Sequence, residues 1–92
     1  MIPEQGFSVS GEYKETGTMA VIDMVQTGKN IEREMRERRL TPKDMQNACG
    51  LGTVGTVYTW IRGKKMPNLD NMIVLAEMFG VTLDDLIAVV HV

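Results

Sequence analysis

The residues of this chain that could do chemistry are mostly basic, and they gather in one part of the sequence. Between residues 29 and 67 nine Lys or Arg stand against four Asp or Glu, a balance of +5. The rest holds one lysine and eight acids, a balance of −7, and the two parts sum to the net charge of −2. Because phosphate contacts are local, the position of charge matters more than its total. The pattern favours an anionic partner, with an ordinary solvated face as the alternative.

The other reactive side chains give no pattern typical of an enzyme or a metal site. His91 stands alone near the C-terminus, without a partner for catalysis or metal binding. Cys49 is the single cysteine, which rules out an intrachain disulfide and predicts a buried thiol in a reducing compartment. Asp84 and Asp85 form a carboxylate pair, but the first turn of a helix accounts for them without catalysis. We therefore expect no enzymatic activity, no cofactor and no metal.

The basic region surrounds a stretch, residues 41–67, that predicts two short helices joined by a turn. Thr41 can cap the first helix, Pro42 suits its first position, and Asp44 completes a capping box. The helix should end at Gly50, where a turn containing a second glycine begins. Its core-facing residues should be Met45 and Ala48.

The second helix of this stretch can be capped by Thr53. Its apolar residues recur at helical spacing and should form one buried stripe. They are Val54, Val57, Trp60 and Ile61. Gly63 should end the helix, and a basic loop with Lys64 and Lys65 leads to Pro67. Helix, turn, helix and basic loop form the arrangement that places a second helix in a DNA major groove.

Another helix should precede this stretch. Gly28 is unfavourable in a helix interior, so we expect the helix to begin at Thr27 or Gly28 and to end at Arg39. Residues 19–25 are apolar but too few to distinguish strand from helix by period. The residues expected inside are Ile31, Met35 and Leu40, and two Glu→Arg pairs expected outside are Glu32–Arg36 and Glu34–Arg38.

Two further helices should follow the basic loop. Asn68 can cap the first, which Gly80 should end, and Thr82 can cap a short one. The residues expected to face the core are Leu69, Met72, Ile73, Ala76, Phe79, Leu83, Leu86 and Ile87. The β-branched tail after them predicts a strand that pairs with residues 20–22 or with another subunit. Residues 1–18 should form a flexible arm, with a short strand conceivable around residues 7–9.

Several sequence blocks in the same order carry a family resemblance. Residues 31–41 read I-x-x-x-M-R-x-x-R-L-T, residues 44–50 read D-M-x-x-A-x-G, and residues 57–67 read V-Y-x-W-x-R-G-K-x-x-P. From about residue 30 to residue 87 the chain resembles the five-helix DNA-binding domain of phage repressors and Cro, the xenobiotic-response-element-like helix-turn-helix family. The resemblance implies an all-α fold: a compact, lambda-repressor-like five-helix domain over residues 19–92, a flexible arm over residues 1–18, and a short terminal strand.

The resemblance also implies which residues contact DNA. It places six residues at the groove: Thr53, Val54, Gly55, Thr56, Tyr58 and Thr59. It assigns phosphate contacts to Lys43, Arg62, Lys64 and Lys65, and Thr41 completes the expected site. Gly55 offers no side chain where relatives often carry Gln or Arg, so direct base readout should be modest unless Arg62 reaches the bases.

Two departures from the family concern the geometry of the turn. Gln46 stands where relatives commonly have Ala, and its amide must point outward or find a hydrogen-bond partner inside. Gly50 lies ten residues before Trp60, one more than in the phage repressors, so the second helix could enter the groove at a different angle.

We therefore expect a sequence-specific regulator of transcription that binds double-stranded DNA as a homodimer, since one such domain reads about half a site. No stretch approaches the roughly 20 apolar residues of a membrane helix and no signal peptide is visible, so we expect a cytoplasmic protein without membrane contact. The alternatives are an antitoxin and a protein-interaction module that keeps the fold with weak or no DNA readout. The sequence identifies no small-molecule effector.

Overall fold

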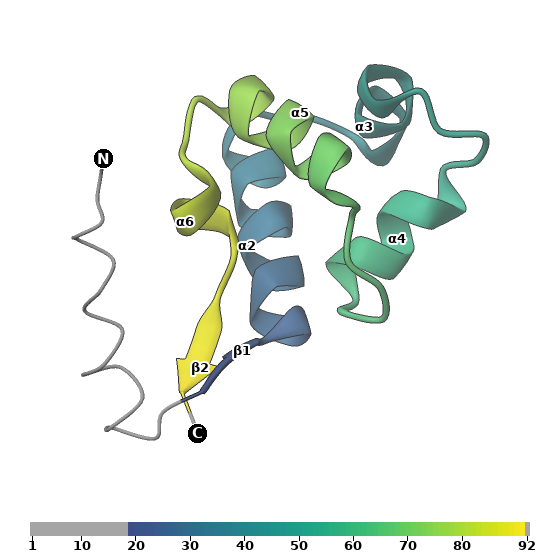
Figure 1. The fold of residues 1–92 in the computed structure, drawn as a ribbon. Helices are drawn as coiled ribbons and strands as arrows, with labels where there is room; N and C mark the ends of the chain where they lie inside the picture. The colour runs from purple at the N-terminus through teal and green to yellow at the C-terminus, as the bar shows by residue number, and fades with distance from the viewer. Residues whose placement is uncertain (1–18, 92) are drawn as a thin grey trace, which may run out of the picture.

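Five helices and one pair of short strands make up residues 19–91, the part of the chain that the computed structural model describes (Figure 1). The predicted all-α, five-helix fold is confirmed. The predicted arm, residues 1–18, and the strand considered for residues 7–9 lie outside the described residues. In chain order the elements are β1 (Ala20–Ile22), α2 (Met24–Glu37), α3 (Pro42–Cys49), α4 (Gly55–Ile61), α5 (Leu69–Phe79), α6 (Leu83–Leu86) and β2 (Val89–His91).

Helix α2 begins earlier than the sequence predicted. Asp23 is its N-cap, and the Asp23 carboxylate accepts a hydrogen bond from the Gln26 N–H at 3.0 Å. Gly28 therefore lies inside the helix. A Cβ atom at this position would lie 2.3 Å from the carbonyl oxygen of Trp60, because α2 and α4 pack closely there. The glycine permits a close contact between two helices, and its use as a helix boundary was wrong.

The predicted capping residues of α3 are confirmed. The Thr41 hydroxyl accepts from the Asp44 N–H at 3.2 Å, and the Asp44 carboxylate accepts from the Thr41 N–H at 2.8 Å. Gly50 ends the helix in the left-handed conformation, with a φ of 66°. Thr82 and Asp85 form the same capping box at α6, and Asn68 caps α5. These local signals were readable because each cap depends on residues only three positions apart.

The core lies between α2, α3, α4 and α5, and α6 closes it. Its buried apolar residues are Ile31, Met35, Met45, Val57, Trp60, Met72, Leu75, Ala76, Phe79 and Leu86. Three residues predicted to face the core are exposed: Ala48, Leu69 and Ile73. Compared with the predicted orientation, helix α5 is rotated about its axis. Leu75, at 0% exposure, lies on the inner face, where the sequence predicted Leu69, which is 64% exposed. The predicted face and the observed face both contain Met72, Ala76 and Phe79, so helical spacing alone could not distinguish them.

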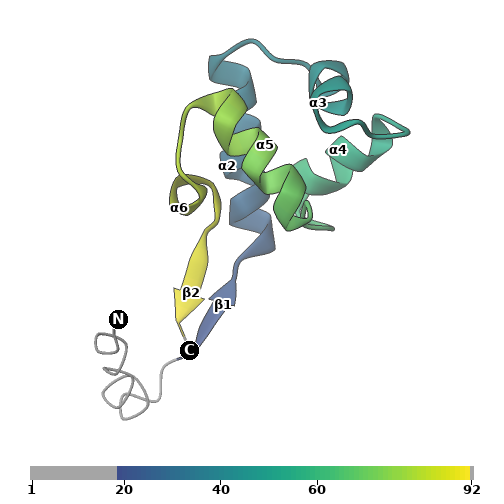
Figure 2. The same cartoon turned by 45° about the horizontal axis from the view of Figure 1, so that its top comes forward.

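The strand predicted for the C-terminal tail is confirmed, and it pairs within the chain. Strands β1 and β2 are antiparallel, with Val21 opposite Val90 and Ile22 opposite Val89. This ribbon extends away from the helices, from the N-terminal end of α2 and the end of α6 (Figures 1 and 2). Every residue of both strands is exposed.

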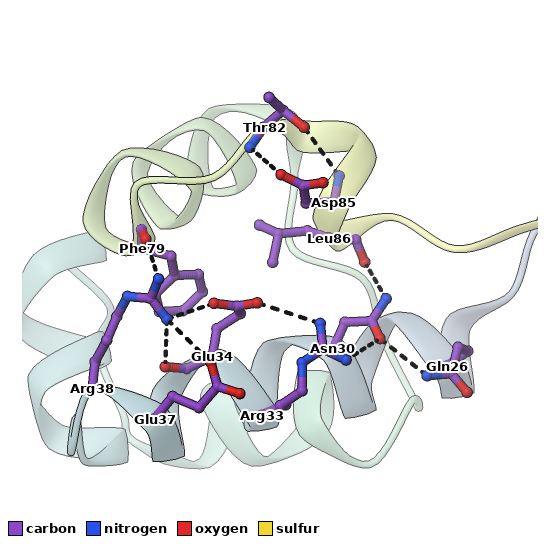
Figure 3. A network of polar contacts seen from close by, with 10 residues as sticks. All are labelled: Gln26, Asn30, Arg33, Glu34, Glu37, Arg38, Phe79, Thr82, Asp85 and Leu86. Atoms are coloured by element: carbon purple, nitrogen blue, oxygen red, sulfur yellow. Dashed lines mark hydrogen bonds and ion pairs between the residues drawn. The ribbon is translucent and has the colours of Figure 1, made fainter.

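Polar side chains connect α2 to α5 and to α6 (Figure 3). The Asn30 amide donates to the Leu86 carbonyl at 2.9 Å in a buried hydrogen bond. The Arg38 guanidinium contacts the Glu34 carboxylate, donates to the Phe79 carbonyl and lies over the Phe79 ring. Glu34 is therefore buried, at 8% exposure, where the sequence predicted an outer position. The second pair, Glu32–Arg36, lies outside as predicted, with 3.5 Å between its charged atoms.

Candidate nucleic-acid interface

One side of helix α4 packs against the rest of the domain, and the other side is exposed. Val57 and Trp60 are buried at 0% and 3% exposure. The opposite side carries Gly55, Tyr58 and the C-cap residue Arg62, which are exposed. The helix is seven residues long, from Gly55 to Ile61. The sequence predicted the buried positions of Val57 and Trp60, because residues three and four apart share a helix face. Val54 and Ile61, predicted in the same buried stripe, are half-buried.

The turn before α4 is held by side chains as well as by backbone. The Gln46 amide donates to the Leu51 carbonyl at 3.1 Å, so the departure from the family's usual Ala gives a half-buried amide with a partner. The Thr53 hydroxyl accepts from the Gly55 N–H at 3.1 Å. Helix α4 begins at Gly55, one residue later than expected for a helix capped at Thr53, and its N-cap is Val54. Thr53 and Val54 consequently lie in the turn that leads into the helix.

Two side-chain interactions order the outer side of α4. The Arg62 guanidinium lies 5.4 Å from the centre of the Tyr58 ring, a cation–π arrangement. The Thr59 hydroxyl donates to the Thr56 carbonyl at 2.6 Å. The Thr59 hydroxyl therefore keeps both of its lone pairs as acceptors, and the side chains of Thr56 and Thr59 are half-buried.

The basic loop is attached to the end of α4 through its backbone. The N–H groups of Lys64 and Lys65 donate to the Thr59 carbonyl at 2.9 and 3.2 Å. Gly63 makes this turn with a φ of 72°, and a Cβ atom there would lie 2.7 Å from the Cα of Val25. The loop thus holds two exposed lysines beside the outer side of α4.

The start of α3 supplies the remaining predicted residues. Thr41 uses its hydroxyl in the capping box, and Lys43, two residues further along, is exposed. Within residues 19–91 no carboxylate forms a salt bridge with Lys43, Arg62, Lys64 or Lys65. These cations consequently have their charge available to an outside partner.

An open groove of about 650 Å³ runs between α2 and α4, and sequence reasoning did not assign it to the site. Tyr58 and Arg62 line it from α4, while Lys29, Glu32 and Arg36 line it from α2. The signal that could have revealed it is the spacing of the three charged α2 residues, which puts them on one side of the helix.

Cys49, which the sequence predicted to be buried, is half-buried and packs partly against the core. Burial raises the pKa of its thiol, which favours the protonated form. Within residues 19–91 no group of three His, Cys, Asp or Glu side chains could hold a metal ion. In the same part of the chain, no helix has the length and hydrophobicity of a membrane span.

Comparison with known proteins agrees with this arrangement of helices. Residues 30–91 match the model of the Cro/C1-type HTH DNA-binding domain, and the chain belongs to this family. The chain is therefore placed among the DNA-binding regulators of transcription, as the sequence resemblance implied. No curated protein matches it.

A solved structure with a similar fold is that of the restriction-modification controller protein C.AhdI from Aeromonas hydrophila. The two structures superpose with a TM-score of 0.62, covering 70% of this chain and 96% of that chain. The sequences are 22% identical, so the similarity concerns the fold.

Proposed function

We propose that this protein recognises a specific sequence of double-stranded DNA by placing α4 in the major groove, and that it regulates transcription from there. The observation that carries the proposal is the division of α4 into a buried side, with Val57 and Trp60, and an outer side that continues into Lys64 and Lys65. The major groove admits one α-helix, and cations beside that helix reach the phosphates.

The contacts divide into those that position the domain and those that read the sequence. Lys43, Arg62 and the two loop lysines neutralise phosphates, which fixes the orientation without specifying bases. Thr56 and Thr59 meet base edges or thymine methyl groups, and Thr53, Val54, Gly55 and Tyr58 complete the surface that faces the groove. Because Gly55 has no side chain, one copy of the domain reads few bases.

Modest readout by one domain is compensated when two copies bind two half-sites. We infer that the protein acts as a homodimer and that the β1–β2 ribbon joins the two copies. Val21, Ile22, Val89 and Val90 are each 44–47% exposed on the ribbon, and neither strand contains Lys, Arg, Asp or Glu. An uncharged strand edge can pair with its own copy across a two-fold axis.

The alternative readings, a protein-interaction module and an antitoxin, give no reason for a cluster of unpaired cations beside α4. The variant with Lys64→Glu and Lys65→Glu separates the readings. Under our proposal it loses DNA affinity while it stays folded, since both ammonium groups are exposed. DNA binding also agrees with the cytoplasmic location expected from the sequence.

Selection of duplexes from a random pool tests the proposed specificity. We expect enrichment of a two-fold symmetric site whose half-sites lie about 10 base pairs apart, or a multiple of that distance. A folded protein that retains duplexes without enriching any sequence would contradict specific recognition. Deletion of the selected site upstream of a reporter gene would then establish the sign of regulation.

A further inference from the structure

The groove between α2 and α4 adjoins the outer side of α4, because Tyr58 and Arg62 belong to both surfaces. Its floor is apolar and includes Met35, Leu40 and Ile61. Its rim on α2 is charged, with Lys29, Glu32 and Arg36 at one side of the helix. A ligand in this groove would meet apolar surface below and charged groups along the edge.

The charges of the groove suit an anion. Three cations, Lys29, Arg36 and Arg62, and one carboxylate, Glu32, line it, which gives 3 − 1 = +2. In the described part of the chain, neither Lys29 nor Arg62 forms a salt bridge, and Arg36 pairs only with Glu32. That pair is long, 3.5 Å, and its side chains are 68% and 45% exposed, so it is weak and easily exchanged.

We propose that the groove receives the sugar-phosphate backbone of the DNA whose major groove holds α4. The proposal rests on the function proposed above and extends the interface from α4 and its loop to α2. The deoxyribose lies against the apolar floor, and the phosphate oxygens accept hydrogen bonds from Lys29 and Arg36. The open shape and its continuity with α4 favour an extended polymer over an enclosed small ligand.

Glu32 opposes this binding. Its carboxylate holds Arg36 in the free protein, and it repels a phosphate that enters the groove. Arg36 must exchange Glu32 for phosphate when DNA binds. Removal of the Glu32 charge should therefore strengthen DNA binding, an effect that a purely structural Glu32–Arg36 pair would not produce.

The test is a fluorescence-anisotropy titration of a selected duplex with the full chain, from about 50 to 200 mM salt. Arg36→Gln should weaken binding about 5- to 20-fold and reduce the slope of log affinity against log salt by about one. Glu32→Gln should strengthen binding about 3- to 10-fold, because one repulsive charge is removed from a phosphate contact. Circular dichroism establishes that each variant is folded.

Matched controls on the same helix carry the same charge changes outside the groove. They are Arg33→Gln, which removes a cation beside Glu34, and Glu37→Gln, which removes an exposed carboxylate. We expect both to change affinity less than about 2-fold. The groove proposal is overturned if Arg36→Gln behaves like Arg33→Gln, or if Glu32→Gln binds no more tightly than Glu37→Gln. If the wild-type protein binds no duplex, the proposed function fails together with it.

Discussion

The backbone of Gly28 in α2 lies against the carbonyl oxygen of Trp60 in α4, and this contact sets the position of α4 on the domain. A Cβ atom on Gly28 would lie 2.3 Å from the Trp60 oxygen and 2.7 Å from the Ile61 oxygen. Both obstacles are backbone atoms, which cannot move away as a flexible side chain can. The close approach of two helices therefore depends on a residue without a side chain.

The variant Gly28→Ala should lower the free energy of unfolding by about 3 kcal/mol or more, because the methyl group overpacks a backbone contact. Urea denaturation followed by circular dichroism measures the loss. Gly55→Ala is the matched control, since a Cβ there would meet only the Thr53 hydroxyl, at 3.5 Å. It should raise stability by about 0.5 kcal/mol. Equal stability of the two variants would contradict the packing described for Gly28.

The two Glu→Arg pairs of α2 should differ strongly in their contribution to stability. Arg38→Ala removes contacts with the buried Glu34 carboxylate and with the carbonyl and ring of Phe79, and it should cost about 2–3 kcal/mol. Arg36→Ala breaks only the exposed pair with Glu32 and should cost less than about 0.5 kcal/mol. Chemical denaturation of both variants provides the comparison. A larger loss for Arg36→Ala would contradict the burial of Glu34.

Acid should weaken the cap of α6. Hydrogen bonds from the Thr82 backbone N–H and then from its side chain lower the pKa of Asp85 below its ordinary value. A carboxyl group whose pKa is lowered by folding stabilises the protein above its unfolded pKa, and the contribution disappears as pH falls through the folded pKa. Asp85→Asn should therefore lower the urea midpoint at pH 7 and have little effect at about pH 2, well below the ordinary pKa of Asp. If Asp85→Asn shifts the urea midpoint equally at both pH values, the ionised Asp85 carboxylate does not stabilise the cap.

The β1–β2 ribbon should decide the oligomeric state. Val90→Lys places a charge on the ribbon and should convert a homodimer into a monomer, as measured by sedimentation velocity of the full chain. Ile73→Lys on α5 is the matched control, because Ile73 and Val90 are both 44% exposed. It should leave the dimer intact. If the Ile73→Lys variant is a monomer while the Val90→Lys variant stays a dimer, the interface lies on α5 and not on the ribbon.

The sequence predicted the features that depend on neighbouring residues. The capping boxes of Thr41 and Thr82 were readable within four residues, and the buried positions of Val57 and Trp60 were readable from helical spacing. Features that depend on contacts between distant segments were missed. Gly28 seemed to begin a helix because its partner is Trp60, and Glu34 seemed exposed because its surroundings come partly from Phe79.

The candidate site shows the same difference between features set by neighbouring residues and features set by distant segments. The α4 residues and the basic loop were predicted from local spacing and from the family resemblance, and their contacts with DNA stay a prediction. The groove between α2 and α4 could not be predicted, because it requires the side of α2 with Arg36 to lie opposite Tyr58. Only the packing of the two helices brings those residues together.

The most direct measurement is the affinity of the wild-type protein for its selected duplex and for a scrambled one, by fluorescence anisotropy from about 50 to 200 mM salt. We predict saturable binding that is tighter for the selected duplex, with log affinity that falls steeply and linearly with log salt. Equal affinity for both duplexes would contradict sequence recognition by α4. Absence of binding at low salt, by a protein shown to be folded, would contradict DNA binding itself.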